Sequence, residues 1–278
     1  LLNLDPEATT HAFGVAGTQA AGVMASFGTM CKPLHAGMAA QSGLRAAEWA
    51  MRGFTGAADI LEHKRGFAAT HGLRFDTDAG LEGMGEKFFC EDILFKYHAA
   101  CYGTHSAIEC ARLIRENPNF AIENIVKVEI RVHTRITHMC DIPAPRDGLG
   151  IKFSLRMTMA LALSGEPTSA LHVYSEEHAA RPDLVAIRDK VTSVIDDRYG
   201  YRGAGVTVHL TDGTVLHEDF DVAIPESDLL IQEAKLTEKF HSLAEPVIGR
   251  VNATKVVDLV LSLEAQPNIS PLIKALTG

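Results

Sequence analysis

Hydrophobic and polar residues follow a helical period at both ends of the chain and a mixture of periods in the middle. From residue 6 to about residue 49, Ala, Gly, Met and Leu recur at helical spacing. Each glycine would cost about 1 kcal/mol in an exposed helix, so this composition suits helices that approach one another closely. The expected elements are a helix capped by Thr9 or Thr10, a turn at residues 28–33, a helix over residues 34–52 and a short helix near residues 57–61.

The middle of the chain contains strand-like as well as helical patterns. "FKYHAACYGTHSAIECARLIREN" predicts a loop that enters an amphipathic helix ended by Asn117 and Pro118, and "IVKVEIRVHTRI" alternates as a half-buried strand does. Two helices are expected at "KFSLRMTMALALSG", closed by Gly165, and at "LVAIRDKVTSVIDD". Alternating runs on both sides of Asp212 and Gly213 predict a hairpin. This order of elements indicates a small α+β unit with a largely antiparallel sheet.

After Pro225 the pattern is helical again, in "SDLLIQEAKLTEKFHSLAEPVIG" and "ATKVVDLVLSLEAQPNISPLIKAL". We therefore predict the α+β class. A mostly helical domain, residues 1–85 and 225–278, is interrupted by a smaller α+β domain with an antiparallel sheet, residues 86–224. A cleft between the two domains is the natural ligand site.

Composition excludes several classes of protein. With 46% hydrophobic and 22% charged residues, the 278-residue chain has the make-up of a soluble globular protein. No apolar run reaches the ~18 residues of a membrane span, and "LLNLDPEATT" lacks the features of a signal peptide, so we expect a cytoplasmic protein without a membrane partner. The net charge is -9 and no basic stripe is present, which argues against nucleic acid as a partner.

The cysteines and the common motifs give little direct information. The chain has five cysteines, whose spacing gives neither a disulfide framework nor a CxxC pair, so reduced thiols fit best. The five are Cys31, Cys90, Cys101, Cys110 and Cys140. No GxGxxG after a strand, Walker sequence, HExxH or GxSxG is found. The chain opens without Met in a small-residue helix that needs packing partners. They come from elsewhere in this chain and from another subunit, or the sequence is part of a longer polypeptide.

Lys32 and His35 form the first group with possible chemistry. They lie three residues apart at the start of the second expected helix, so both can point to the same side of its first turn. Free backbone N–H groups and the helix dipole favour an anion there, and a lysine would help to hold a carboxylate. The alternative is a solvated surface lysine beside a hydrogen-bonded core histidine.

The second group lies in "FKYHAACYGTHS". His98, Cys101 and His105 recur at spacings of three and four, which would place them on one helical face if the helix begins that early. A zinc site would need further ligands that the sequence does not offer, and a Cys–His nucleophilic pair lacks a third orienting group. Cys101 as an ordinary buried residue is the commoner outcome. Lys96 precedes this helix, and Lys152 either points into the cleft or lies on the surface.

Taken together, "FGTMCKPLHAGMAAQSGLRAAEWAMRGFTGAADILE" and "FKYHAACYGTHSAIE" resemble the MmgE/PrpD family. The first stretch holds a K-P-L-H-x-G-x-A-A-x-S-G block and a G-F-T-G turn, and the second runs from a lysine through a cysteine to T-H-S. "KFSLRMTMALALSG" and "KFHSLAEPVIG" are similar to later landmarks, so the resemblance covers essentially the whole chain. The family includes 2-methylcitrate dehydratase, cis-aconitate decarboxylase and iminodisuccinate epimerase.

The resemblance implies a helical domain interrupted by a smaller α+β lid domain, a homodimer, and a cleft without metal. By position, Lys32 and Lys96 look like cleft lysines that meet substrate carboxylates, and His35 lines or supports the pocket. Cys101 stands where some members have a histidine, and Met157 where decarboxylase-like members have a tyrosine. The family's amino-terminal helical half, with its own active-site histidine and aspartate, is not found, so the chain looks like the carboxy-terminal portion of a member.

Family reactions share removal of a proton beside a carboxylate, which requires cations to stabilise the developing charge and a group such as histidine to exchange the proton. We expect a hydro-lyase of the 2-methylcitrate dehydratase type that acts on a small polycarboxylate without a cofactor. The alternatives are an epimerase of an iminodisuccinate-type substrate and a non-catalytic binding or assembly module. The candidate catalytic residues are His35, Lys96 and Cys101, and the candidate substrate-binding residues are Lys32, Lys96, His98 and Lys152.

Overall fold

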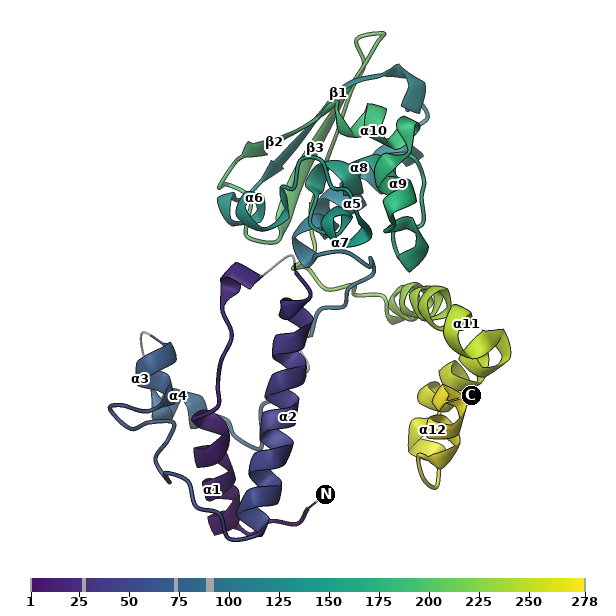
Figure 1. Ribbon diagram of the computed structural model, residues 1–278. Coiled ribbons are helices and arrows are strands. Elements are labelled where there is room, and N and C mark those ends of the chain that lie inside the picture. The colour runs from purple at the N-terminus through teal and green to yellow at the C-terminus, as the bar shows by residue number, and fades with distance from the viewer. Residues whose placement is uncertain (1, 27–28, 73–74, 89–92, 278) are drawn as a thin grey trace. The chain divides into compact units, whose positions relative to one another are not determined.

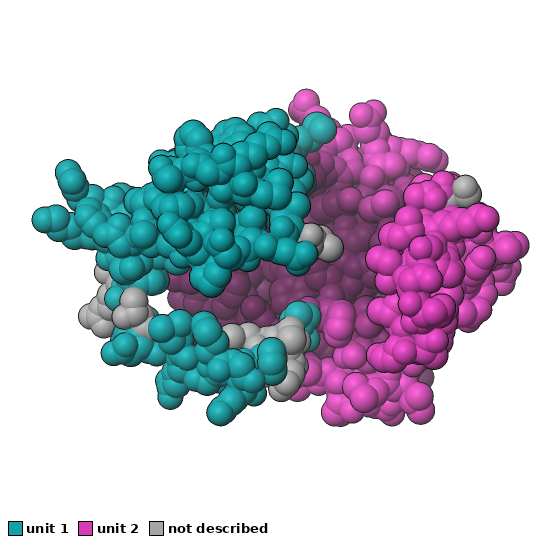
Figure 2. All heavy atoms as spheres, turned by 90° about the horizontal axis from the view of Figure 1, so that it is seen from below, with its two compact units in different colours: residues 1–93 teal, residues 94–278 magenta. Residues whose placement is uncertain are grey.

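The computed structural model describes residues 2–26, 29–72, 75–88 and 93–277. The chain forms two compact units, residues 1–93 (unit 1) and residues 94–278 (unit 2), which Figure 2 shows in teal and magenta. Cys90 and the beginning of the turn predicted at residues 28–33 lie outside the described residues. The predicted division into domains at residues 85 and 224 stays a prediction.

Unit 1 is helical. Its elements are α1 (Pro6–Gly17), the 3-10 turn η1 (Met24–Ser26), α2 (Cys31–Met51), α3 (Phe67–His71) and α4 (Thr77–Leu81). Helices α1 and α2 pack together, and glycine is required where α1 meets the loop after α2, since a Cβ on Gly14 would lie 2.5 Å from the carbonyl oxygen of Ala57. The close approach explains part of the glycine-rich composition.

Two sequence predictions for unit 1 are wrong in detail. The cap of α1 is Asp5, whose carboxylate accepts from the Ala8 N–H at 2.7 Å, rather than Thr9 or Thr10. The helix can begin this early because Pro6 has no N–H to satisfy. Residues 57–61 form turns instead of a short helix, because the Ile60 carbonyl accepts from the Phe67 N–H at 2.7 Å and closes a loop.

Unit 2 contains a four-stranded sheet in the order β2-β1-β3-β4 (Figure 1). The strands are β1 (Ile125–Val132), β2 (Val191–Ile195), β3 (Gly203–Leu210) and β4 (Val215–Asp221). The β1–β3 and β3–β4 pairs are antiparallel, and β1–β2 is parallel. The fold is therefore α+β as predicted, but the sheet is mixed rather than purely antiparallel.

The parallel strand arises where the sequence pattern predicted a single helix over "LVAIRDKVTSVIDD". In the structure α10 (Pro182–Arg188) ends after two turns and β2 follows. The run Val191-Thr-Ser-Val-Ile195 is rich in β-branched residues, which favour a strand. Since the chain reaches β2 from β1 through several intervening helices, a parallel pairing is available to it.

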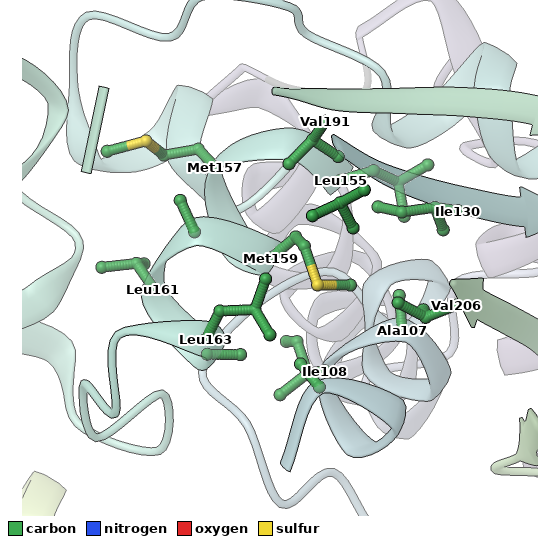
Figure 3. Close-up of a cluster of buried hydrophobic side chains, with 14 of the residues drawn as sticks. Ala107, Ile108, Ile130, Leu155, Met157, Met159, Leu161, Leu163, Val191 and Val206 are labelled. Carbon is green, nitrogen blue, oxygen red and sulfur yellow. The ribbon is translucent and has the colours of Figure 1, made fainter. Parts of the chain in front are cut away.

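Helices cover one face of this sheet. Helix α5 (His105–Glu116) packs on β3 and β4, and α8 (Leu155–Leu163) packs on α5 and β2. In β1, Val128, Ile130 and Val132 are buried, whereas the residues between them are not, which confirms the predicted half-buried strand. Side chains from α5, α8 and the strands meet in one hydrophobic core (Figure 3).

The remaining elements surround this core or follow it. They are the helices α6 (Thr134–Cys140), α7 (Gly148–Ile151), α9 (Glu176–Ala180), α11 (Leu229–Leu261) and α12 (Ser270–Thr277), and the 3-10 turns η3 (Tyr102–Thr104), η4 (Ile122–Asn124), η5 (Leu171–Val173) and η6 (Leu263–Ala265). Helix α11 is interrupted at Gly249, whose φ of 76° lies in the left-handed region. Among the described residues, no helix is both long and apolar enough to cross a membrane.

Candidate functional site

The segment from Lys96 to Thr104 enters α5 as a loop and not as an early helical turn. The Cys101 N–H donates to the carbonyl of Lys152 at 2.9 Å, and the Ala99 N–H donates to the carbonyl of Thr168 at 2.9 Å. These bonds hold the backbone extended until η3, so α5 begins at His105. His98, Cys101 and His105 therefore do not form the single helical face that their spacing allowed.

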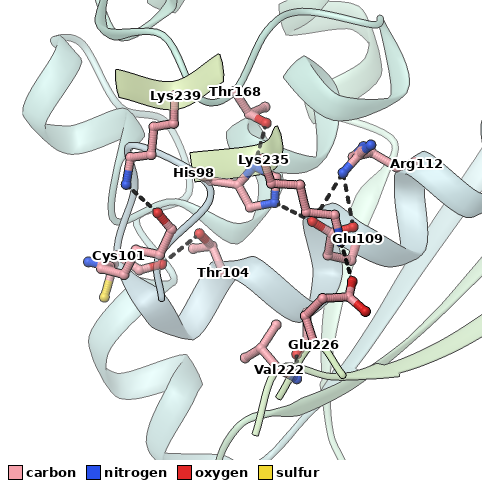
Figure 4. Close-up of polar contacts among 12 residues, drawn as sticks. His98, Cys101, Thr104, Glu109, Arg112, Thr168, Val222, Glu226, Lys235 and Lys239 are labelled. Carbon is pink, nitrogen blue, oxygen red and sulfur yellow. Dashed lines mark hydrogen bonds and ion pairs between the residues drawn. The ribbon is translucent and has the colours of Figure 1, made fainter. Parts of the chain in front are cut away.

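His98 forms a buried polar network with Glu109 and Thr168 (Figure 4). The Glu109 carboxylate accepts from His98 Nε2 at 2.8 Å, and His98 Nδ1 lies 2.8 Å from the Thr168 hydroxyl. In the neutral tautomer with the proton on Nε2, Nδ1 accepts the hydroxyl proton of Thr168. Both ring nitrogens are thus occupied, so His98 in this arrangement holds Glu109 and offers no nitrogen to a substrate.

The charge of Glu109 is also stabilised from the surface. Arg112 Nη1 lies 3.2 Å from Glu109 Oε2. Burial alone would raise the pKa of the Glu109 carboxyl, but the hydrogen bond from His98 and the electrostatic interactions with His98, Arg112 and Lys235 outweigh it, so the pKa is lowered. Next to this network lies a polar cavity of about 300 Å³, lined in part by Tyr97, His98 and Lys235.

His105, the first residue of α5, is buried with one ring nitrogen unbonded. Its exposed fraction is 1%, and Nε2 has no hydrogen-bond partner. The ring is hydrogen-bonded to the backbone of Ala100, a bond that must use Nδ1. Burial, followed by electrostatic interactions with His98 and Lys96, lowers the pKa of His105 to about 2. The ring is consequently neutral, with a bare acceptor nitrogen in a dry position.

Lys239, a residue of α11, lies beside the backbone of Lys96. Its ammonium donates to the backbone carbonyl of Lys96, and its side chain reaches from α11 toward the loop before α5 (Figure 4). Burial and then the positive charge of Lys96 lower the pKa of Lys239. Lys239 also contributes to the lowered pKa of His105. We call Lys96, Lys239 and His105 the Lys96 cluster. Sequence reasoning gave Lys239 no role, although it belongs to the quoted "KFHSLAEPVIG" stretch.

Two other predicted residues lie close to this segment. Lys152 meets Cys101 through the backbone bond described above, and its ammonium lies 5.4 Å from the centre of the Tyr174 ring. Burial lowers the pKa of Lys152. Cys101 is buried, as an ordinary small core residue would be. Within the described residues, no group of three or more His, Cys, Asp or Glu side chains is arranged to hold a metal ion.

Lys32 and His35 belong to the first turn of α2, in unit 1. Both are partly exposed, and they share the side of the helix expected from their spacing. The His35 ring packs against Gly22, where a Cβ would lie 3.2 Å from His35 Nδ1. Because these two residues lie in unit 1 and Lys96 lies in unit 2, the meeting of Lys32 and Lys96 at one substrate stays a prediction.

The described elements and the Lys96 cluster define an α+β chain with paired lysines beside a buried histidine. Comparison with known proteins identifies the family: residues 98–264 match the MmgE/PrpD C-terminal domain and residues 1–78 match the MmgE/PrpD N-terminal domain. The chain belongs to the MmgE/PrpD family, as the sequence motifs predicted. It carries sequence that matches both domains.

The curated relatives described next share less than 30% sequence identity with the chain. The chain is 27% identical to a cis-aconitate decarboxylase of Aspergillus terreus, with 99% of this chain and 61% of the relative covered. It is 28% identical to a cis-aconitate decarboxylase-like protein of Aspergillus oryzae, covering 100% of this chain and 61% of the relative. With the cis-aconitate decarboxylase of Mus musculus the identity is 23%, covering 96% of this chain and 57% of the relative. The chain thus spans about three fifths of the length of these proteins.

Proposed function

We propose that this protein is a lyase that acts on a small di- or tricarboxylate through proton transfer at a carbon next to a carboxylate. The observation that carries the proposal is the Lys96 cluster, which groups two ammonium groups and a neutral imidazole beside the start of α5 in a chain of the MmgE/PrpD family. The relatives named as cis-aconitate decarboxylases make decarboxylation of a cis-aconitate-type substrate the first reaction to test.

The roles follow from the charge that such a reaction develops. In decarboxylation the bond to one carboxylate breaks, carbon dioxide leaves, and the electron pair remains on carbon, conjugated with a neighbouring carboxylate, until a proton is added. Lys96, with Lys32 in the complete site, binds the carboxylates and stabilises that charge. His35 is the predicted proton carrier.

Dehydration of a 2-methylcitrate-type substrate is the second candidate. It is favoured by Met157, which stands where decarboxylase-like members have a tyrosine and is fully buried in α8, so this position supplies no phenol. In that reaction a base removes the proton and hydroxide leaves from the adjacent carbon. Return of the proton on the opposite face would instead give epimerisation. We also propose that the protein forms a homodimer, as the family resemblance predicts.

Turnover by the purified 278-residue chain is the test. The chain is incubated separately with cis-aconitate, 2-methylcitrate and iminodisuccinate, and products are identified by NMR. Lys32→Ala and Lys96→Ala are each expected to lower kcat/KM by about 100-fold or more on the active substrate, because each removes a cation from the developing charge. Lys255→Ala, a change at an exposed lysine of α11, is the matched control.

The outcomes separate the candidate functions. Loss of carbon dioxide identifies a decarboxylase, and loss of water identifies a dehydratase. Normal turnover by both lysine variants would show that the assigned roles are wrong. Absence of turnover on all three substrates, with an intact fold, would favour a non-catalytic binding or assembly module over an enzyme.

A further inference from the structure

Thr168 makes hydrogen bonds with two separate parts of unit 2. Its hydroxyl lies 2.8 Å from His98 Nδ1 (Figure 4). Its backbone carbonyl accepts from the Ala99 N–H at 2.9 Å and from the Tyr174 hydroxyl at 2.7 Å. The exposed fraction of Thr168 is 5%, so water has little access to these bonds. One residue of the loop after α8 therefore holds both the loop before α5 and the Tyr174 ring.

The end of α8 brings Thr168 to this position. Gly165 has a φ of 80°, in the left-handed region, and the Glu166 N–H donates back to the Leu161 carbonyl at 3.0 Å. This is a common way for a helix to end at a glycine, and Pro167 does not continue the helix. The chain consequently leaves the axis of α8 just before Thr168, whose side chain and carbonyl then meet the loop before α5.

These bonds connect two lysines that are predicted to bind substrate. Lys96 lies two residues before His98, in the loop that Thr168 holds. Lys152 Nζ lies 5.4 Å from the centre of the Tyr174 ring, whose hydroxyl donates to the Thr168 carbonyl. The segments that carry the two lysines are thus joined through a single buried residue.

The bond between Thr168 and His98 depends on a hydroxyl group. The Glu109 carboxylate accepts from His98 Nε2 at 2.8 Å, which places a proton on that nitrogen and leaves Nδ1 to accept from the Thr168 hydroxyl. A methyl group in place of the hydroxyl would leave a buried acceptor without a donor. Valine has nearly the shape of threonine but lacks the hydroxyl, whereas serine keeps it, so these two substitutions separate the bond from the packing.

We propose that Thr168 is a positioning residue, which sets the separation of Lys96 and Lys152 and with it the spacing of the carboxylates that the site binds. The inference rests on the proposed function for the ligand and for the roles of the two lysines. The hydroxyl and the carbonyl of Thr168 are both used within the fold, so Thr168 acts through the lysines and does not itself bind the substrate. Misplacement of a binding group by about 1 Å can cost about 100-fold in activity, which gives such a residue a measurable effect.

Binding of two saturated carboxylates tests the proposal without turnover. Propane-1,2,3-tricarboxylate has carboxylates on adjacent carbons, and adipate has its two carboxylates at the ends of a longer methylene chain. Isothermal titration calorimetry with each is carried out on the full chain and on Thr168→Val, Thr168→Ser and Thr158→Val. Thr158 is the matched control, because it is fully buried in α8 and its hydroxyl donates to the Ser154 carbonyl at 2.8 Å, away from the loop before α5.

We expect Thr168→Val to raise the dissociation constant of the tricarboxylate about 10-fold and that of adipate by less than about threefold, because the flexible chain of adipate tolerates a changed spacing. Thr168→Ser and Thr158→Val should each change both constants by less than about twofold. Tyr174→Phe removes the donor to the Thr168 carbonyl but keeps the ring beside Lys152. It should give a loss of about threefold for the tricarboxylate, and it decides the question if Thr168→Val does not fold.

Several outcomes would overturn the inference. These are tricarboxylate binding by Thr168→Val that equals binding by Thr158→Val, equal losses for the two carboxylates, and a loss in Thr168→Ser as large as in Thr168→Val. If Thr168→Val does not fold, unchanged binding by Tyr174→Phe has the same meaning.

The turnover assay then separates this inference from the proposed function. If the parent chain turns over a polycarboxylate but the binding results go against Thr168, the function stands and the positioning role fails. If the binding results agree with the expectation but no substrate is turned over, the positioning role stands and the lyase proposal fails. A chain that neither binds nor reacts contradicts both.

Discussion

Helices α2 and α8 are both rich in apolar residues, yet they differ in how far their side chains are buried within their own units. Every residue of α8 except Arg156 is buried, whereas the buried residues of α2 are Ala46 and Ala50. Leu34, Met38 and Leu44 of α2 are 55%, 49% and 58% exposed. An apolar pattern therefore indicates that a helix has a packing face, but not that this chain alone covers it. Measurements of stability can test this contrast.

The largest effect is expected from Glu109→Ala, in the buried network of unit 2. The change leaves His98 Nε2 without its acceptor and Arg112 without its carboxylate, and breaking a buried pair in this way costs about 3–5 kcal/mol. The free energy of unfolding measured in urea should fall by about that amount. Glu116→Ala, at an exposed site on the same helix, is the control. Equal stability of the two variants would mean that the network contributes nothing to folding.

A core truncation in the sheet should cost slightly less. Ile130 is fully buried between the sheet and the helices (Figure 3), and Ile→Ala in such a place removes about 2–5 kcal/mol. Val126 lies on the same strand but is 54% exposed, so Val126→Ala should change the free energy of unfolding by less than about 0.5 kcal/mol. A small loss at Ile130 would indicate a core that is loosely packed.

A smaller, pH-dependent effect is expected from His105. Its folded-state pKa is about 2 and its unfolded value is close to 6.5, so the unfolded chain binds a proton that the folded chain excludes. This contribution to stability is complete above pH 6.5 and is lost progressively as the pH falls. The stability lost between pH 7.5 and pH 5.5 is about 1 kcal/mol.

The measurement compares urea unfolding at those two pH values for the parent chain, His105→Asn and His138→Asn. Asn can keep the hydrogen bond to Ala100 but does not titrate, so the parent should lose about 1 kcal/mol more than His105→Asn over this interval. His98, Lys96 and Lys239 are present in all three proteins. His138 is exposed, and His138→Asn is the matched His→Asn change outside the Lys96 cluster. Parallel pH profiles for all three would show that His105 is protonated freely in the fold.

The smallest effect is expected in unit 1. Leu34→Ala should change the free energy of unfolding by less than about 0.5 kcal/mol, because the side chain is more than half exposed. Leu161→Ala in α8 is the matched truncation and should cost about 3 kcal/mol. If Leu34→Ala were as costly, the α2 face would be covered in solution, and gel filtration of the parent chain would then show whether a second copy covers it.

Much of unit 2 could be predicted from local patterns. Strand β1, the hairpin around Gly213, and helices α5 and α8 each have enough residues in one period, or a specific turn residue, to be recognised. Strand β2 was missed because five residues directly after a helix are too few to establish a new period. The cap of α1 was misplaced because Asp5, Thr9 and Thr10 are all residue types that can cap a helix.

The site was predictable only where its residues lie close together in the sequence. The Lys96 loop and the link from Cys101 to Lys152 come from recognisable motifs, but 143 residues separate Lys239 from Lys96. No local pattern joins two such positions. The unbonded nitrogen of His105 depends on burial and on neighbours from other elements, which are properties of the folded chain alone. The roles of Lys32, His35, Lys96, Cys101, His98 and Lys152 stay predictions.

The position of β1 in the sheet has a consequence for folding. Both of its neighbours, β2 and β3, follow it in the chain, and the hairpin of β3 and β4 is the only pairing of adjacent strands that a short turn joins among the strands described. During synthesis β1 therefore emerges before either neighbour, with Val128, Ile130 and Val132 exposed to water. Local pairs form earlier than distant ones, so the hairpin should fold first and then capture β1. Until that step, the nascent chain is at its greatest risk of self-association.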